Sequence, residues 1–163
     1  MTFFKMMPKP GRDPSKTIKA LAAFKKVVDD YPVSDQAEPS REKIRECEER
    51  LAFHSAEIGI LYHNRKAYRA AISRLTEVMT DYPEYSGLGQ VYYYLADSYC
   101  QMKQYDQAIP FFGKVVTDYA GLKLAKAAMR KLAEIERIDK DAAKKSGRRL
   151  TPPASRDIKI DKH

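Results

Sequence analysis

Residues 70–83 read AAISRLTEVMTDYP, and this stretch decides the fold because its pattern occurs three times along the chain. Its apolar skeleton consists of Ala71, Leu75 and Val78, and it closes with Asp81-Tyr82-Pro83. The same skeleton precedes Tyr31 and Tyr119, as Ala20, Phe24 and Val27 and as Ala108, Phe112 and Val115. Spacings of four and three residues place such positions on one face of a helix. The sequence therefore predicts a tandem helical repeat.

A second apolar helix precedes each of the two later copies, and a short polar turn separates it from the skeleton. Its positions are Ile58, Gly59, Tyr62, Tyr92, Leu95, Ala96 and Tyr99. Small residues pair where the two helices are expected to cross, Gly59 with Ala71 and Ala96 with Ala108, and Pro83 ends one unit because proline has no N–H to continue a helix. This pattern resembles tetratricopeptide repeats. We therefore expect an all-α solenoid of helical hairpins.

The spacing of the repeats predicts one long helix. Asp30 and Asp81 are 51 residues apart, whereas Asp81 and Asp118 are 37 apart. The difference, 51 − 37 = 14 residues, is close to four turns at about 3.6 residues per turn, so extra turns keep the apolar face in register. Between Pro39 and Asn64 the sequence has no further proline and one glycine. A single helix is expected to span this segment.

The repeat domain is expected to cover residues 13–144. Residues 1–12 are interpreted as a loop and the remnant of an incomplete hairpin, and residues 145–163 as a disordered basic tail. A helix from about Leu122 to Lys144 is expected to cap the last hairpin through a stripe of Leu124, Ala128, Leu132 and Ile135. At the other end, a helix starting near Asp13-Pro14 under an aspartate cap has no partner helix before it. Its apolar face is therefore expected to stay partly uncovered, at Leu21, Phe24 and Val28.

Catalytic and metal-binding patterns are missing from the sequence. The net charge is +8, and half of it falls in the tail from Asp139 onward, which would suit anionic lipid or an acidic protein face as well as nucleic acid. No zinc-binding spacing, phosphate-binding loop or nucleic-acid recognition element accompanies it. His54 beside Glu57 is read as two neighbours on a helix, and Cys47 and Cys100 as buried free thiols. We expect no enzymatic activity, no cofactor, no metal and no nucleic-acid partner.

Several segments resemble the BamD (YfiO) family of outer-membrane assembly lipoproteins. They are residues 6–17 with their Arg12-Asp13 loop, the helix that ends in Tyr31-Pro32, residues 48–54, and residues 62–75 closing at Asp81-Tyr82-Pro83. The likeness covers about residues 3–137. It includes the loop and the elongated helix, which generic tetratricopeptide repeats lack.

The resemblance implies a non-enzymatic scaffold on the periplasmic face of the outer membrane, with peripheral membrane contact only. Its implied partner is the set of periplasmic domains of a barrel insertase (BamA-like), and other assembly lipoproteins and unfolded outer-membrane proteins are further partners. Measured against the family, we expect the signal peptide, the lipidated cysteine and about the first two repeats to be missing from this chain. Arg74 occupies a position that the family implicates in the insertase contact, and Arg65 and Arg69 are added because they lie close by.

A peptide groove is expected on the first helices of the hairpins, because these helices line the concave face in tetratricopeptide solenoids. The residues assigned to it are His63, Asn64, Gln90, Tyr93, Tyr94, Asp97 and Gln101. Aromatic area with amide groups suits a polypeptide better than a small metabolite. Two other functions stay open at this point: a generic tetratricopeptide adaptor, for example of the Tol–Pal coordinating type, and a basic nucleic-acid-binding module.

Overall fold

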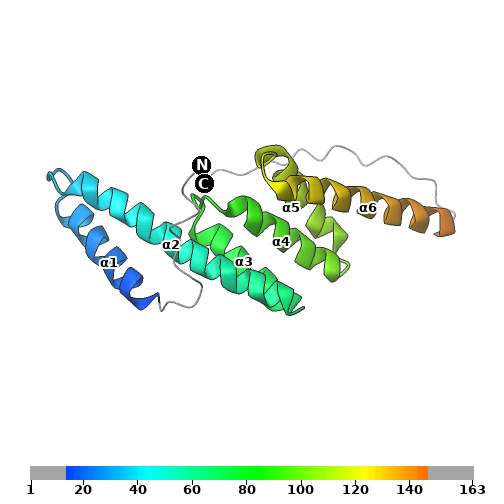
Figure 1. The fold of residues 1–163 in the computed structure, drawn as a ribbon, viewed down its shortest axis with the longest axis horizontal. Coiled ribbons are helices and arrows are strands. Elements are labelled where there is room, and N and C mark those ends of the chain that lie inside the picture. The colour runs from blue at the N-terminus through cyan, green and yellow to red at the C-terminus, as the bar shows by residue number, and fades with distance from the viewer. Residues whose placement is uncertain (1–13, 147–163) are drawn as a thin grey trace.

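The structure, a computed structural model, describes residues 14–146, and these form six helices with no strand among them (Figure 1). The helices are α1 (Ser15–Asp30), α2 (Ala37–Asn64), α3 (Tyr68–Asp81), α4 (Leu88–Gln101), α5 (Tyr105–Asp118) and α6 (Lys123–Ser146). Each packs against the next along the chain, and α2 also contacts α4 while α4 contacts α6. The expected all-α hairpin solenoid is confirmed, with α2, α4 and α6 stacked as one layer.

The long helix is confirmed as well. Helix α2 runs without a break for 28 residues, from Ala37 to Asn64, and its two halves pack against different neighbours (Figure 1). Glu49, near its middle, accepts hydrogen bonds from the backbone N–H and the hydroxyl of Ser86. Ser86 lies just before α4, so this carboxylate also places negative charge at the positive end of that helix. The extra turns of α2 thus connect α1 to the later hairpins.

The second and third copies of the repeated skeleton lie in the core, whereas the first copy, on α1, is only partly buried. The fully buried side chains at the centre of the core, all with 0 % exposure, include Leu75, Val78, Val91, Leu95, Phe112 and Val115. Gly59 is required at the crossing of α2 and α3, because a Cβ there would lie 2.6 Å from a methyl carbon of Leu75. The sequence paired Gly59 with Ala71, but the atoms nearest to such a Cβ belong to Leu75, one turn later on α3. A large side chain therefore fills the space beside this glycine.

The two ends of the solenoid differ in how well they are covered. Helix α6 buries Ala128 and Ile135 against the last hairpin and so acts as the expected cap. Helix α1 contacts α2 but has no buried residue, and Ile18 is 52 % exposed. Its N-cap is Pro14, which makes no side-chain capping hydrogen bond. The proposed aspartate cap, the N-terminal loop and the C-terminal tail lie outside the described residues.

The turn inside each hairpin has the same backbone conformation. Lys66 joins α2 to α3 with φ 62°, and Lys103 joins α4 to α5 with φ 60°. In each turn three consecutive backbone N–H groups donate to carbonyls of the preceding helix, Lys66 to His63 at 2.8 Å and Lys103 to Cys100 at 2.8 Å among them. Both turns lie along the lower edge of the molecule in Figure 1. We call this the hairpin-turn edge, and define it as Arg65, Lys66, Arg69, Met102 and Lys103.

Candidate partner-binding surface

A polar network, made of one ion pair and one histidine–carboxylate contact, joins the three stacked helices α2, α4 and α6. His63 Nε2 lies 3.2 Å from Asp97 Oδ2, and Lys131 Nζ lies 3.3 Å from Asp97 Oδ1. The side chains of His63 and Asp97 are only 12 % and 11 % exposed. A buried carboxylate is costly unless it is paired, so Asp97 ties its neighbours on both sides. We call this set the inner joint.

The protonation state of His63 is coupled to the hydroxyl of Ser98. His63 Nδ1 lies 2.9 Å from Ser98 Oγ, and that hydroxyl also reaches the carbonyl of Tyr94 at 2.7 Å. A neutral ring donates from Nε2 to Asp97, so Nδ1 must accept from Ser98. A protonated ring donates from both nitrogens, and the Ser98 hydroxyl then turns to Tyr94. Burial lowers the pKa of His63, and although Asp97 opposes this, Lys131 adds to it, so the neutral arrangement prevails at neutral pH.

Together with Ser98, the inner joint brings serine, histidine and aspartate into contact, but the serine hydroxyl is not accessible as a nucleophile. Ser98 is fully buried within α4, with 0 % exposure, and its oxygen is engaged by His63 and by the Tyr94 carbonyl. A substrate would need to reach that oxygen and find donors for an oxyanion beside it. What the joint does show is a link between α2, α4 and α6 through the contacts of Asp97.

Residues predicted for the peptide groove divide into two groups. His63, Tyr93, Tyr94 and Asp97 are largely or partly buried and in contact with one another, with ring centroids 5.1 Å apart for His63 and Tyr94 and 5.5 Å apart for Tyr93 and Tyr94. Tyr93 also packs edge-on against the core residue Phe112. The others, Asn64, Gln90 and Gln101, lie apart from these ring contacts; Asn64 and Gln101 are exposed and Gln90 is partly buried.

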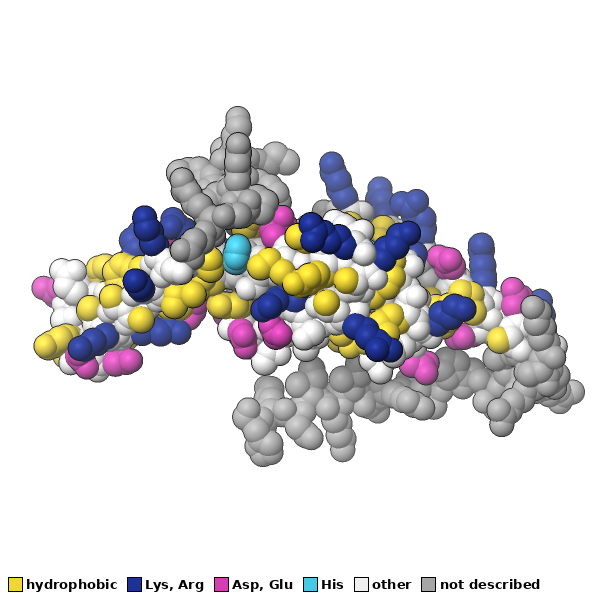
Figure 2. Space-filling view, turned by 90° about the horizontal axis from the view of Figure 1, so that it is seen from below, with side chains coloured by type: hydrophobic (Ala, Val, Ile, Leu, Met, Phe, Trp, Pro, Cys, Tyr) yellow, Lys and Arg dark blue, Asp and Glu magenta, His cyan; other side chains and the backbone are white. Residues whose placement is uncertain are grey.

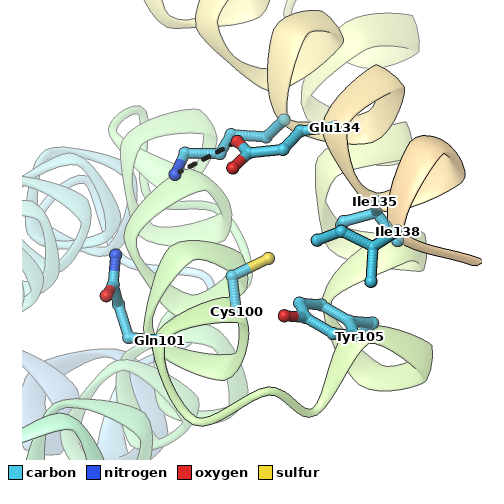
Figure 3. A pocket seen from close by; sticks show the side chains of 7 residues that line it. Cys100, Gln101, Tyr105, Glu134, Ile135 and Ile138 are labelled. Carbon is cyan, nitrogen blue, oxygen red and sulfur yellow. Dashed lines mark ion pairs between the residues drawn. The ribbon is translucent and has the colours of Figure 1, made fainter. Parts of the chain in front are cut away.

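A small pocket opens between the end of α4, the start of α5 and α6 (Figure 3). Its volume is about 130 Å³, and its lining consists of Cys100, Gln101, Tyr105, Lys131, Glu134, Ile135 and Ile138. Burial, with the nearby charge of Asp97, raises the pKa of the Cys100 thiol to about 11. Because the thiolate is the reactive form, this cysteine is a poor nucleophile near neutral pH. The pocket has room for one side chain of a partner.

The predicted partner-binding arginines differ in their surroundings. Arg74, on α3, pairs with Glu77 one turn later at 2.8 Å, and its side chain is 42 % exposed. Arg65 and Arg69 are exposed at and after the hairpin turn. An open hollow of about 450 Å³ lies beside Arg69, lined by residues 66–70 and Met102. Sequence reasoning did not single out Lys66, Met102 or Lys103, because their proximity depends on the packing of two hairpins.

Helices able to cross a membrane were sought among the described residues, and none is both long and apolar enough. The groups of histidine, cysteine, aspartate and glutamate in the same part of the chain include none that could hold a metal ion.

Two relatives of the chain are outer membrane protein assembly factors. The chain is 36% identical over 73 residues to the outer membrane protein assembly factor BamD of Vibrio cholerae serotype O1, which is 45% of this chain and 30% of that protein. It is 25% identical over 130 residues to the outer membrane protein assembly factor BamD of Rickettsia prowazekii, covering 80% of this chain and 52% of that protein. The chain thus spans about half or less of the length of these relatives.

Two family models match successive parts of the chain. Residues 90–121, which hold α4 and α5, match a tetratricopeptide repeat model. Residues 1–89 match the model of YfiO, described as outer membrane lipoprotein, and this match includes α1, α2 and α3. Because it covers more than half of the 163 residues, the chain belongs to the YfiO family of outer membrane lipoproteins.

Proposed function

We propose that this chain is a non-enzymatic scaffold of the machinery that assembles outer-membrane β-barrel proteins, and that it binds the periplasmic domains of the barrel insertase. The observation that carries this proposal is the YfiO match over residues 1–89, supported by relatives named as outer membrane protein assembly factors. The same match supports a position on the periplasmic face of the outer membrane.

The architecture suits a scaffold because side-chain contacts connect the helices α2, α4 and α6 to one another. Asp97 links His63 of α2 to Lys131 of α6 from its place on α4, so the three helices present their exposed residues in constant register. A binding site on rigid helices keeps its geometry better than one on loops. The exposed Asn64 and Gln101 and the partly buried Tyr94 remain candidates for contact with other assembly lipoproteins or with unfolded barrel proteins.

Arg74 is proposed to contact the insertase by releasing the carboxylate of Glu77 and binding a carboxylate of the insertase. It already holds Glu77 at 2.8 Å on its own helix. A planar guanidinium can bind a carboxylate through two parallel hydrogen bonds, which lysine cannot reproduce. Because Glu77 must be released first, the net gain is smaller than for an arginine without a partner.

The proposal is tested by titrating this chain with the insertase periplasmic domains from the same genome. Wild type should bind, and Arg74→Ala should weaken the complex by about 1–3 kcal/mol, at the low end of the loss seen for buried charge pairs because Arg74 is partly exposed. Glu77→Gln is the matched control: it frees Arg74 and should leave the affinity equal or higher. No binding by wild type would contradict the proposed function, whereas full binding by Arg74→Glu would remove this residue from the contact.

A second candidate function is a general tetratricopeptide adaptor, favoured by the tetratricopeptide match over residues 90–121. Such an adaptor would bind an extended or helical peptide along α4 and α6 and would not recognise the insertase. The same titration separates the two functions, because only the scaffold requires binding to those domains.

A further inference from the structure

Lysine occupies the left-handed position in both hairpin turns. A positive φ brings Cβ close to the following carbonyl, which is why glycine or asparagine usually stands there. Here Lys66 and Lys103 take that conformation, with φ 62° and 60°. Glycine would adopt this conformation without strain, so a strained residue at the position points to a role for its side chain. The two lysines share one property that glycine lacks, a positive charge at the same edge of the molecule.

The cations of the hairpin-turn edge have no acidic partner within the part of the chain that the structure describes. Arg65, Lys66, Arg69 and Lys103 are all exposed, and none of the ion pairs among residues 14–146 involves them. In contrast, Arg74 is already paired with Glu77. Figure 2, which views the molecule from below Figure 1, shows Lys and Arg side chains beside hydrophobic ones across this side. These exposed cations are therefore available to pair with carboxylates of a partner.

An apolar hollow adjoins two of these cations, Lys66 and Arg69. It measures about 450 Å³ and is lined by Lys66, Ala67, Tyr68, Arg69, Ala70 and Met102. Both hairpins contribute, since Met102 follows α4 while the other residues belong to the turn before α3 and to its first turn. Methionine, tyrosine and alanine suit an apolar side chain, and methionine adapts readily to its shape.

We propose that the hairpin-turn edge binds an acidic segment of a partner protein, which places one apolar side chain in the hollow while its carboxylates meet Lys66, Arg69 and Lys103. Resting on the proposed function, this inference names the partner segment as part of the insertase periplasmic domains and places the centre of the contact here, with Arg74 at its border. Charge complementarity selects an anionic partner. The hollow selects a protein segment over a phosphate backbone, because a phosphate has no side chain to fill it.

The test removes the two turn lysines without harming the fold. In Lys66→Gly/Lys103→Gly, glycine adopts the positive φ freely, so the variant should melt at or above the wild-type temperature. Its affinity for the insertase periplasmic domains should fall roughly tenfold, with a weaker dependence on salt, as expected for the loss of two interfacial cations. The matched control is Lys19→Gln/Lys126→Gln, which removes two exposed lysines on α1 and α6, outside the edge, and should bind like wild type.

A second variant tests the hollow alone. Ala70→Leu fills it while every charge stays in place, and it should weaken the complex at least severalfold without lowering the melting temperature. Wild-type affinity in both Lys66→Gly/Lys103→Gly and Ala70→Leu would overturn this inference and leave the proposed function intact. No binding by wild type would overturn both. Vesicles of anionic phospholipid that bind wild type and displace the periplasmic domains would also overturn it, by assigning the edge to a membrane surface.

Discussion

At the residue scale, single positions of the repeat were predictable where packing is set within one hairpin. The requirement for a small residue at position 59 follows from the spacing of α2 and α3, and the structure confirms it, because Leu75 fills the adjacent space. The inner joint could not be predicted in the same way. His63, Asp97 and Lys131 are each 34 residues from the next, and only the stacking of α2, α4 and α6 brings their side chains together.

Replacing either of two helical glycines by alanine should change the stability of the protein in opposite directions. Gly59→Ala places a Cβ 2.6 Å from the fully buried Leu75 and should destabilise the protein by about 1–3 kcal/mol through overpacking. Gly113, inside α5, has no atom within 4 Å of such a Cβ. Gly113→Ala should therefore stabilise by about 0.5–1 kcal/mol, the helix-propensity gain. Urea unfolding of both variants measures this, and equal effects would contradict the close crossing of α2 and α3.

The inner joint should make stability depend on pH. Burial lowers the pKa of His63 in the folded state below its unfolded value of about 6.5. Between these two pKa values the unfolded chain binds more protons, so the free energy of unfolding decreases as pH falls below about 6.5 and is fully retained above it. Burial disfavours the added proton most, Asp97 attracts it and Lys131 repels it, so the attraction of Asp97 does not offset the other two effects on the pKa of His63.

Urea unfolding at a series of pH values from 7.5 down to 5 measures this dependence. His63→Gln is the control, because it removes the titrating group while keeping a polar side chain beside Asp97, and its stability should change less with pH over the same range. A wild-type stability that rises toward pH 5 would show that Asp97 raises the pKa of His63 instead.

At the element scale, helices were more predictable than the turns between them. The 28 residues of α2 follow from composition and repeat spacing, and α6 starts and ends within two residues of its expected bounds. The conformation of the turns could not be predicted from composition. A positive φ usually occurs at glycine, yet lysine occupies these positions, at Lys66 and Lys103. The hairpin-turn edge was therefore not predictable from local sequence signals.

Helix α1 should contribute less to stability than the helices of the core. Phe24 is partly buried on a helix with no buried residue, whereas Phe112, its equivalent in the repeat, is 0 % exposed. Phe112→Ala should cost about 3–5 kcal/mol, and Phe24→Ala about 1–2 kcal/mol because less apolar area is lost. Denaturant unfolding of the two variants checks this. A larger loss for Phe24→Ala would mean that the exposed face of α1 is covered in solution.

At the scale of the whole molecule, the fold class and the family could both be predicted from the sequence. The periodic skeleton indicates the fold class, and residues 1–89 and 90–121 match family models. The proposed partner-binding surface was only partly predictable from the sequence. Arg65 and Arg69 were chosen for their closeness to Arg74, and they lie on the hairpin-turn edge, while Arg74 itself is paired with Glu77. Adjacent turns from two hairpins create that edge, and repeat spacing alone does not show which side chains they bring together.

The central claim is that a rigid hairpin stack holds the insertase through its hairpin-turn edge. Hydrogen–deuterium exchange of this chain, with and without the insertase periplasmic domains, tests it most directly. Binding should slow exchange at residues 64–70 and 101–105 together, since both turns form one surface, and should leave α1 unchanged. Protection confined to α1, or to only one of the two turns, would contradict the claim.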